Sequence, residues 1–245
     1  NLTIATSGFV DTTSYAAYAD FSWDFTDKLS ASLGGRYTSD EKEGGVYRQN
    51  FTGLYSPLFG NNAAVPGLVR SDYTNDRTFD QFTPRASVSY EFTDTFTTYA
   101  SYSEGFKSGG FDMRGDVVLT PDTVNGYDPE TVQSYEIGAK GTLFDDRLSY
   151  NFAAFYADYS DQQIPRQQPT VTGSIASFVD NAGASTIQGV ELEGSAQLSD
   201  RFSLNYGVGW TDAEFDEYNT FTVVPNPAPP PATLTVPVDL SDTAV

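Results

Sequence analysis

The feature that most constrains this chain is an alternation of apolar and polar residues on both sides of four short acidic turns. Successive side chains of a β-strand point to opposite faces, so a period of two marks a strand with one apolar and one polar face. Asp, Ser and Thr suit the turns because their short side chains can hydrogen-bond nearby backbone. The pattern therefore predicts four antiparallel hairpins. Their turns are TDK at 26–28, TDT at 93–95, DDR at 145–147 and SDR at 199–201.

The two faces of the predicted strands differ in charge as well as in polarity. Near the turns and through the strand centres, charged residues fall on the polar face, and exceptions such as Asp158 and Asp212 lie far from the turns. A charge on a lipid-facing surface at the bilayer midplane costs about 2–4 kcal/mol. This segregation therefore favours an apolar face that meets lipid. The charged residues of the polar face are Asp20, Asp24, Arg36, Arg85, Glu91, Glu136, Lys140, Glu191 and Glu193.

Strand length and aromatic spacing separate a transmembrane barrel from a soluble β-sandwich. The alternating segments are roughly 10–14 residues long, against about 5–6 for a usual strand. An apolar band about 25 Å tall takes about ten residues of tilted strand. Aromatic residues recur ten positions apart, from Tyr15 to Phe25 and from Phe82 to Phe92. We therefore predict an all-β fold, a transmembrane antiparallel β-barrel to which this chain contributes about eight strands.

The connections on the side opposite the short turns are predicted to be long loops. Short periplasmic turns and long outer loops are the polarity of an outer-membrane barrel. The stretch VVPNPAPPPATLTVP is expected to be an extended loop segment, because proline removes hydrogen-bond donors from a central strand. The chain is predicted to begin and end on the outer side, so we expect it to be an internal part of a larger barrel. The predicted loops are about 40–78, 107–129, 162–182 and from 214 onward.

Composition excludes several classes of function. The 245 residues include no His and no Cys, which removes imidazole and thiolate metal ligands and an ordinary Ser-His-Asp triad. The formal net charge of −20 argues against nucleic acid, whose phosphates require Lys and Arg. Glu191 and Glu193 resemble a glycosidase carboxylate pair, but both lie on one barrel face. We predict no enzymatic activity, no cofactor and no metal ligands.

Five segments, in order, resemble the barrel of TonB-dependent outer-membrane receptors over most of residues 12–218. The resemblance implies a barrel of about 22 strands filled by an N-terminal plug. Residues 1–245 would then be part of the barrel domain, with the plug and the last strands outside this chain. No plug and no TonB-contacting segment is visible in the sequence. The segments are GGRYTSDEKE (34–43), FTPRASVSY (82–90), YASYSEGFKSGGF (99–111), and two longer ones at 128–163 and 181–218.

The resemblance also implies a function, a location and partners. Members import a scarce ligand, usually a ferric siderophore, with energy delivered through TonB. The implied location is the Gram-negative outer membrane, where the partners would be lipid, lipopolysaccharide, TonB and the ligand. Two alternatives remain: a passive outer-membrane channel, which would lack the plug, and a soluble carbohydrate-binding β domain, which would not need detergent.

Aromatic and cationic residues of the predicted outer loops are the candidate ligand contacts. Arginine can pair with oxygen and stack on flat groups, which suits an anionic aromatic chelate. Ordinary loop packing is the alternative. Charged residues on the inward face are candidate contacts to a plug, and a hydrated wall is the alternative there. The candidate ligand contacts are Tyr47, Arg48, Phe51, Tyr55, Arg70, Phe106, Lys107, Phe111, Arg114 and Arg166, and the candidate plug contacts are Arg36, Arg85, Glu136, Lys140, Glu191 and Glu193.

Overall fold

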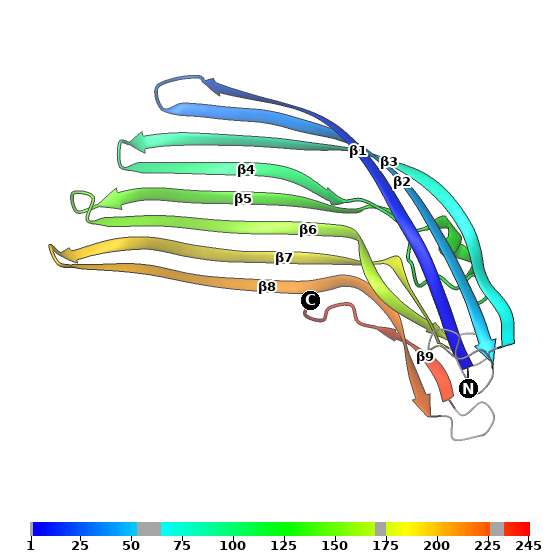
Figure 1. The fold of residues 1–245 in the computed structure, drawn as a ribbon. Coiled ribbons are helices and arrows are strands. Elements are labelled where there is room, and N and C mark those ends of the chain that lie inside the picture. The colour runs from blue at the N-terminus through cyan, green and yellow to red at the C-terminus, as the bar shows by residue number, and fades with distance from the viewer. Residues whose placement is uncertain (1, 53–64, 170–174, 226–232) are drawn as a thin grey trace.

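The fold is an open sheet in which each strand runs antiparallel to the one before it (Figure 1). The computed structural model describes residues 2–52, 65–169, 175–225 and 233–245. Within these residues the sheet has nine strands that follow one another in sequence order. The predicted all-β antiparallel fold is confirmed. The strands are β1 Leu2–Asp24, β2 Leu29–Thr52, β3 Val65–Thr93, β4 Phe96–Lys107, β5 Glu130–Leu143, β6 Leu148–Pro169, β7 Ile175–Ser199, β8 Phe202–Pro225 and β9 Thr233–Asp239.

The four acidic turns lie where the sequence predicts them, between β1 and β2, β3 and β4, β5 and β6, and β7 and β8. In the first turn the hydroxyl of Thr26 accepts hydrogen bonds from the backbone N–H groups of Lys28 (3.2 Å) and Leu29 (2.9 Å). In the third turn Asp145 and Asp146 have φ of 53° and 64°. Asp is one of the few residues that adopt this left-handed conformation readily, which explains the acidic pair there.

Strand register keeps the apolar residues on one face from β1 to β8. One transverse row reads Trp23, Ala31, Val88, Ala100, Ile137, Ala154, Val190 and Trp210, each directly opposite the next. A shift of one residue in any pairing would move a strand's apolar set to the other face. The polar face carries cross-strand serine pairs instead. Their hydroxyl oxygens are 2.6 Å apart in Ser30–Ser89, 2.7 Å in Ser32–Ser87 and 2.8 Å in Ser149–Ser195.

The apolar face is uncovered. Phe21 is 72% exposed and Val208 is 66% exposed, and the described strands form no second sheet that could pack on this face. A face this large and apolar requires a non-aqueous neighbour. An apolar face that meets lipid agrees with the predicted barrel, whereas the soluble-domain alternative would need a cover for this face that the described strands do not provide.

The predicted long loops at 40–78, 162–182 and from 214 onward are largely wrong. β2 and β3 continue to Thr52 and from Val65, β6 and β7 continue to Pro169 and from Ile175, and β8 reaches Pro225. These extensions mix polar and apolar residues on both faces, as in SDEKEGGVYRQNFT at 39–52 and IASFVDNA at 175–182, so the sequence shows no regular alternation there. Backbone pairing with the neighbouring strand continues nevertheless, because it does not depend on apolar side chains. Residues 53–64 and 170–174 lie outside the described part of the chain.

The proline-rich stretch at 223–237 divides in three. Residues 223–225 end β8, residues 226–232 lie outside the described part, and the rest belongs to β9, Thr233–Asp239, which the sequence did not predict. β9 pairs with the outer end of β8, where Pro237 lies opposite Phe221. It is the edge strand of the described sheet. Proline is tolerated at an edge, because its missing N–H can face away from the ladder.

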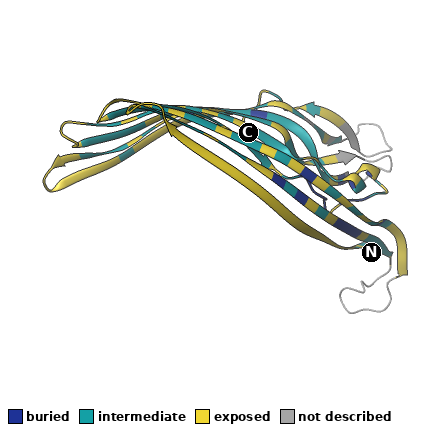
Figure 2. Cartoon of the chain, turned by 90° about the horizontal axis from the view of Figure 1, so that it is seen from above, coloured by how far each residue is buried: buried dark blue, intermediate teal, exposed yellow. Residues whose placement is uncertain are grey.

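The predicted loop at 107–129 is confirmed as a non-strand connection for residues 108–129, here called the inner segment. It contains a short 3-10 helix, η2 (Pro121–Asn125). No helix in the described residues is long and apolar enough to cross a membrane. The inner segment lies against the outer half of the sheet, meaning the part away from the four short turns, from about Ser39 onward in β2 (Figure 1). Buried residues gather in this half (Figure 2).

Candidate ligand-binding site

The inner segment packs on the polar face of β2 and β3. The ring of Phe111, which is 5% exposed, lies directly over Gly44, where a Cβ atom would come within 2.5 Å of the ring. Lys42, which shares the parity of Gly44, donates from Nζ to the carbonyl of Gly109 at 2.6 Å. Further bonds run from Arg48 Nη1 to the Arg114 carbonyl (2.7 Å), from Ser71 Oγ to the Gly115 carbonyl (2.8 Å) and from Asn75 Nδ2 to the Val124 carbonyl (2.8 Å).

The other side of the inner segment is fixed to the hairpin of β6 and β7. The backbone N–H of Val179 donates to Asp112 Oδ2 at 2.7 Å, and Gln163 Nε2 donates to the Ser108 carbonyl at 3.0 Å. Asn181 Nδ2 donates to the Asp128 carbonyl at 2.8 Å. The segment therefore spans the polar face from β2 and β3 to β6 and β7.

Asp116 anchors the inner segment to the two arginines of the sheet. Its side chain is 5% exposed, and Arg70 Nε lies 2.5 Å from Asp116 Oδ2. Arg48 Nε lies 3.7 Å from the same oxygen. The structure therefore brings the candidate ligand contacts Arg48 and Arg70 together, but around an internal carboxylate. Replacing both arginines would also leave Asp116 without a counter-charge. A loss of ligand affinity in such a variant would therefore not identify the arginines as ligand contacts.

Asp112 is a second anchor, and it binds another candidate residue. Besides the bond from Val179, its carboxylate accepts Arg114 Nε at 3.0 Å and Arg114 Nη2 at 2.9 Å. The hydrogen bond to Asp112 raises the pKa of the Arg114 guanidinium. Asp112 is 8% exposed. This buried carboxylate therefore holds the guanidinium group of Arg114 in position.

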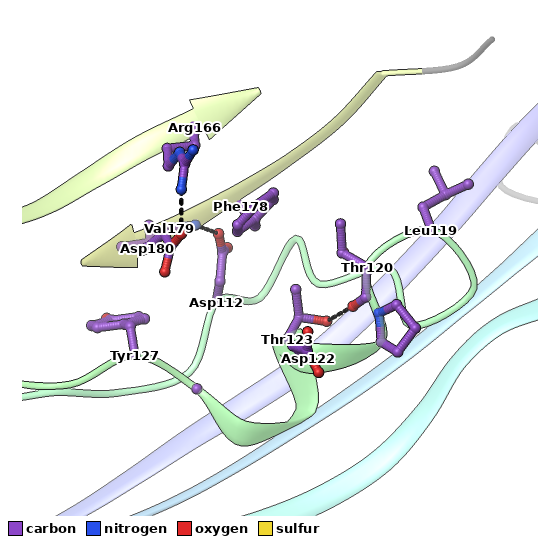
Figure 3. Close-up of a pocket in the computed structure, with 12 residues that line it drawn as sticks. Asp112, Leu119, Thr120, Asp122, Thr123, Tyr127, Arg166, Phe178, Val179 and Asp180 are labelled. Carbon is purple, nitrogen blue, oxygen red and sulfur yellow. Dashed lines mark hydrogen bonds and ion pairs between the residues drawn. The ribbon is translucent and has the colours of Figure 1, made fainter. Parts of the chain in front are cut away.

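A cavity of about 280 Å³ lies between the inner segment and the β6–β7 hairpin (Figure 3). On the hairpin side, Arg166 Nη1 donates to Asp180 Oδ2 at 2.7 Å. Burial raises the pKa of the Tyr127 phenol, and the nearby Asp112 raises it further. The phenol therefore stays protonated at neutral pH and can donate a hydrogen bond. The lining residues are Asp112, Leu119, Thr120, Pro121, Asp122, Thr123, Gly126, Tyr127, Arg166, Phe178, Val179 and Asp180.

The remaining candidate ligand contacts are scattered. Tyr47 and Phe51 have the parity of the opposite face of β2, and Tyr47 donates from its hydroxyl to Gln49 at 2.9 Å. Phe106 has the parity of the apolar face of β4. Lys107 lies 3.9 Å from Glu130. Tyr55 is outside the described residues. Of the candidates, Arg166 lines the cavity, and Arg114 binds its wall residue Asp112.

The candidate plug contacts share the polar face of the sheet. Arg85 forms an ion pair with Asp20. Glu136 accepts a hydrogen bond from the Tyr99 hydroxyl at 2.7 Å. Glu193 accepts one from Asn151 Nδ2 at 3.2 Å, and Arg36 Nε donates to Thr38 Oγ1 at 3.0 Å. Lys140 and Glu191 have the parity of the same face. Their contact with a plug remains a prediction.

Sequence reasoning missed the carboxylates and aromatic residues of the cavity. The aromatic and cationic candidates lie mostly elsewhere in the outer half, whereas the lining carries Asp112, Asp122 and Asp180 together with Tyr127 and Phe178. The run FDMRGD at 111–116 was the available signal. Its two acidic residues lie beside an arginine in a segment that the periodicity left outside the strands.

Comparison with known proteins identifies the family. Residues 2–241 match the family model described as TonB dependent receptor-like, beta-barrel. The chain belongs to this family of transport receptors. The metal-pseudopaline receptor CntO of Pseudomonas aeruginosa is 31% identical over 144 residues, which are 58% of this chain and 18% of the receptor. The ferric-pyoverdine BN7/BN8 receptor of Pseudomonas putida is 26% identical over 214 residues, covering 86% of this chain and 22% of the receptor.

Solved structures of an uptake receptor and of a metal transporter share the fold. The ferric yersiniabactin uptake receptor FyuA from Yersinia pestis superposes with a TM-score of 0.65 at 20% identity, over 86% of this chain and 28% of that one. The copper transporter OprC superposes with a TM-score of 0.56 at 14% identity, over 86% of this chain and 33% of that one. The chain thus spans about a quarter to a third of the length of these structures. The family consists of receptors rather than enzymes, in agreement with the sequence-based prediction.

Proposed function

We propose that these residues belong to an outer-membrane receptor that imports a chelated metal ion, with a ferric siderophore as the leading ligand. Membership of the receptor family is the observation that carries this proposal. The names of the relatives support it, because they refer to ferric pyoverdine, metal–pseudopaline and ferric yersiniabactin. The uncovered apolar face supports the membrane location, since it would otherwise meet water.

The proposed partners follow from the same reading. Outer-membrane lipid and lipopolysaccharide would cover the apolar face, and TonB would supply the energy for import. We propose that residues 1–245 are part of the barrel domain, and that the plug and the remaining strands lie outside this stretch. The small fraction of each relative that the chain covers supports this division. The charged residues of the polar face would then meet the plug or the water around it.

Uptake of radioactive iron from iron-starved culture medium tests the proposed function. Cells that carry the full-length receptor should accumulate iron, and cells that lack it should not. Collapse of the proton gradient or removal of TonB should abolish this uptake. Uptake that persists without either would instead favour a passive channel. Repeating the assay with copper, zinc and nickel would identify a receptor for another metal, as the copper transporter OprC suggests.

A further inference from the structure

We propose that the cavity between the inner segment and the β6–β7 hairpin binds a positively charged group, such as an amine, on the imported chelate. This inference rests on the proposed import function and specifies the chemical class of its ligand. It differs from the expectation of an anionic chelate held by free arginines.

The first argument is that the cations of the outer half already have partners among the described residues. Arg48 and Arg70 share Asp116, and Arg114 is bound to Asp112. A ligand anion would therefore meet guanidinium groups whose charge is already compensated by internal carboxylates. The remaining cations are engaged as well: Arg77 with Asp128 (2.5 Å), Lys107 with Glu130 (3.9 Å), Arg166 with Asp180 (2.7 Å) and Lys42 with the Gly109 carbonyl (2.6 Å).

The second argument is the charge that remains in the cavity. Arg114 compensates Asp112, and Arg166 compensates Asp180. Asp122 also lines the cavity and has no hydrogen-bond or ion-pair partner among the described residues. One carboxylate is therefore left to face an incoming ligand, so the cavity favours a cation over an anion.

The third argument is the aromatic part of the same cavity lining. The rings of Tyr127 and Phe178 belong to the cavity wall, one from the inner segment and one from β7 (Figure 3). A cation near the face of an aromatic ring is attracted by the ring quadrupole. A carboxylate and two rings around one space therefore suit an ammonium group.

The size of the cavity limits what enters it. Sites that enclose a whole drug-sized ligand measure roughly 300–1,000 Å³, and this cavity measures about 280 Å³. It fits one branch of a metal chelate rather than the whole complex. We therefore place the charged branch in the cavity and the metal centre outside it.

Chemical modification of the chelate tests the charge preference in cells that express the full-length receptor. Radioactive iron is added to iron-starved medium, the chelate that the receptor takes up is purified, and its amines are acetylated, which removes their positive charge. Acetylation is expected to lower receptor-dependent uptake about tenfold. Uptake that is unchanged by acetylation, or a transported chelate without a positively charged group, would overturn the inference while leaving the proposed function intact. The absence of any receptor-dependent uptake would overturn both.

Substitutions then locate the preference. Asp122→Asn should lower the affinity for the chelate that carries the charged branch about threefold, the effect of an exposed ion pair, and Tyr127→Leu about tenfold, since the ring is partly desolvated. Asp76→Asn is the matched control, because Asp76 is an exposed carboxylate on the opposite face of β3. Heat-modified gel mobility verifies that each variant is folded. Equal affinities for folded Asp122→Asn, Tyr127→Leu and Asp76→Asn receptors would exclude the cavity as the binding site.

Discussion

At the scale of single residues, the outer half is organised by buried carboxylates that each bind more than one group. Asp116 faces both Arg48 and Arg70, and Asp112 accepts bonds from Arg114 and from the Val179 backbone. Such a carboxylate fixes the position of a coil segment that has no strand pairing of its own. The inner segment can therefore hold a defined cavity wall without belonging to the sheet.

We expect Asp116→Asn to loosen the inner segment, because it leaves two largely buried guanidinium groups without a counter-charge. Breaking a buried ion pair from one side costs about 3–5 kcal/mol, and we expect about 2–3 kcal/mol here, because Arg48 and Arg70 retain 22% and 15% exposure. Hydrogen exchange of the amides at 115–125 in the full-length receptor measures the effect. Asp76→Asn is the control, since Asp76 is an exposed carboxylate on the face of β3 that points away from the inner segment. Equal exchange in both variants would contradict the anchoring role of Asp116.

At the scale of strands, side-chain parity decides which substitutions the sheet tolerates. In β8, Val208 lies on the apolar face and Asn205 on the polar face. Their partners in β7 are Leu192 and Ser195, respectively. Both positions belong to β8 and both are exposed in the described sheet. Their burial is therefore similar, and only the face differs.

We expect Val208→Arg to destabilise the full-length receptor by about 2–4 kcal/mol, because it places a charge in the lipid-facing band. Asn205→Arg should have a much smaller effect, because a charge on the polar face can remain hydrated. The unfolding midpoint in denaturant, followed by heat-modified gel mobility, measures both. Equal shifts for the two variants would show that the two faces have been assigned wrongly.

The strands also show which parts of the fold could be predicted from the sequence and which could not. The turns and the faces near them were predictable, because alternation such as Tyr15 to Trp23 directly reports a two-faced strand. The outer extensions were not, since β2 beyond Ser39 has polar residues on both sides. The position of the inner segment was also hidden, because it depends largely on side chains that bond backbone carbonyls such as those of Gly109 and Val124. A carbonyl is present at every residue and leaves no pattern in the sequence.

At the scale of the whole molecule, the described sheet has two unpaired edges. β1 pairs only with β2 among the described strands, and β9 with the residues that follow it covers β8 only from Ala213 to Pro225. The membrane-level part of each edge therefore presents backbone donors and acceptors to its surroundings. Each such group costs several kcal/mol when it is left unsatisfied in lipid, so in the proposed membrane location these edges would need further strands to pair with.

We therefore expect residues 1–245 produced alone to remain unfolded or to aggregate in detergent, whereas the full-length receptor gives a heat-modifiable band. The reason is that the two edges of the shorter protein have no neighbouring strands to pair with, although its apolar and polar residues already lie on opposite faces. Circular dichroism and gel mobility of the two proteins provide the comparison. A stable, monomeric β-structure formed by the shorter protein would mean that this sheet can close on itself.

The long strands also determine how far the receptor projects from the cell. β3 has 29 residues, and about ten of them cross the apolar band. At about 3.3 Å per residue the rest would extend roughly 60 Å along the strand. In the proposed membrane location, the rim would stand among the surface sugars of the bacterium instead of beneath them. Antibodies, phages and other large particles would then meet this rim first. Selection by such particles would act on the sequence of the rim, which can vary without changing the part of the wall that lies in the membrane.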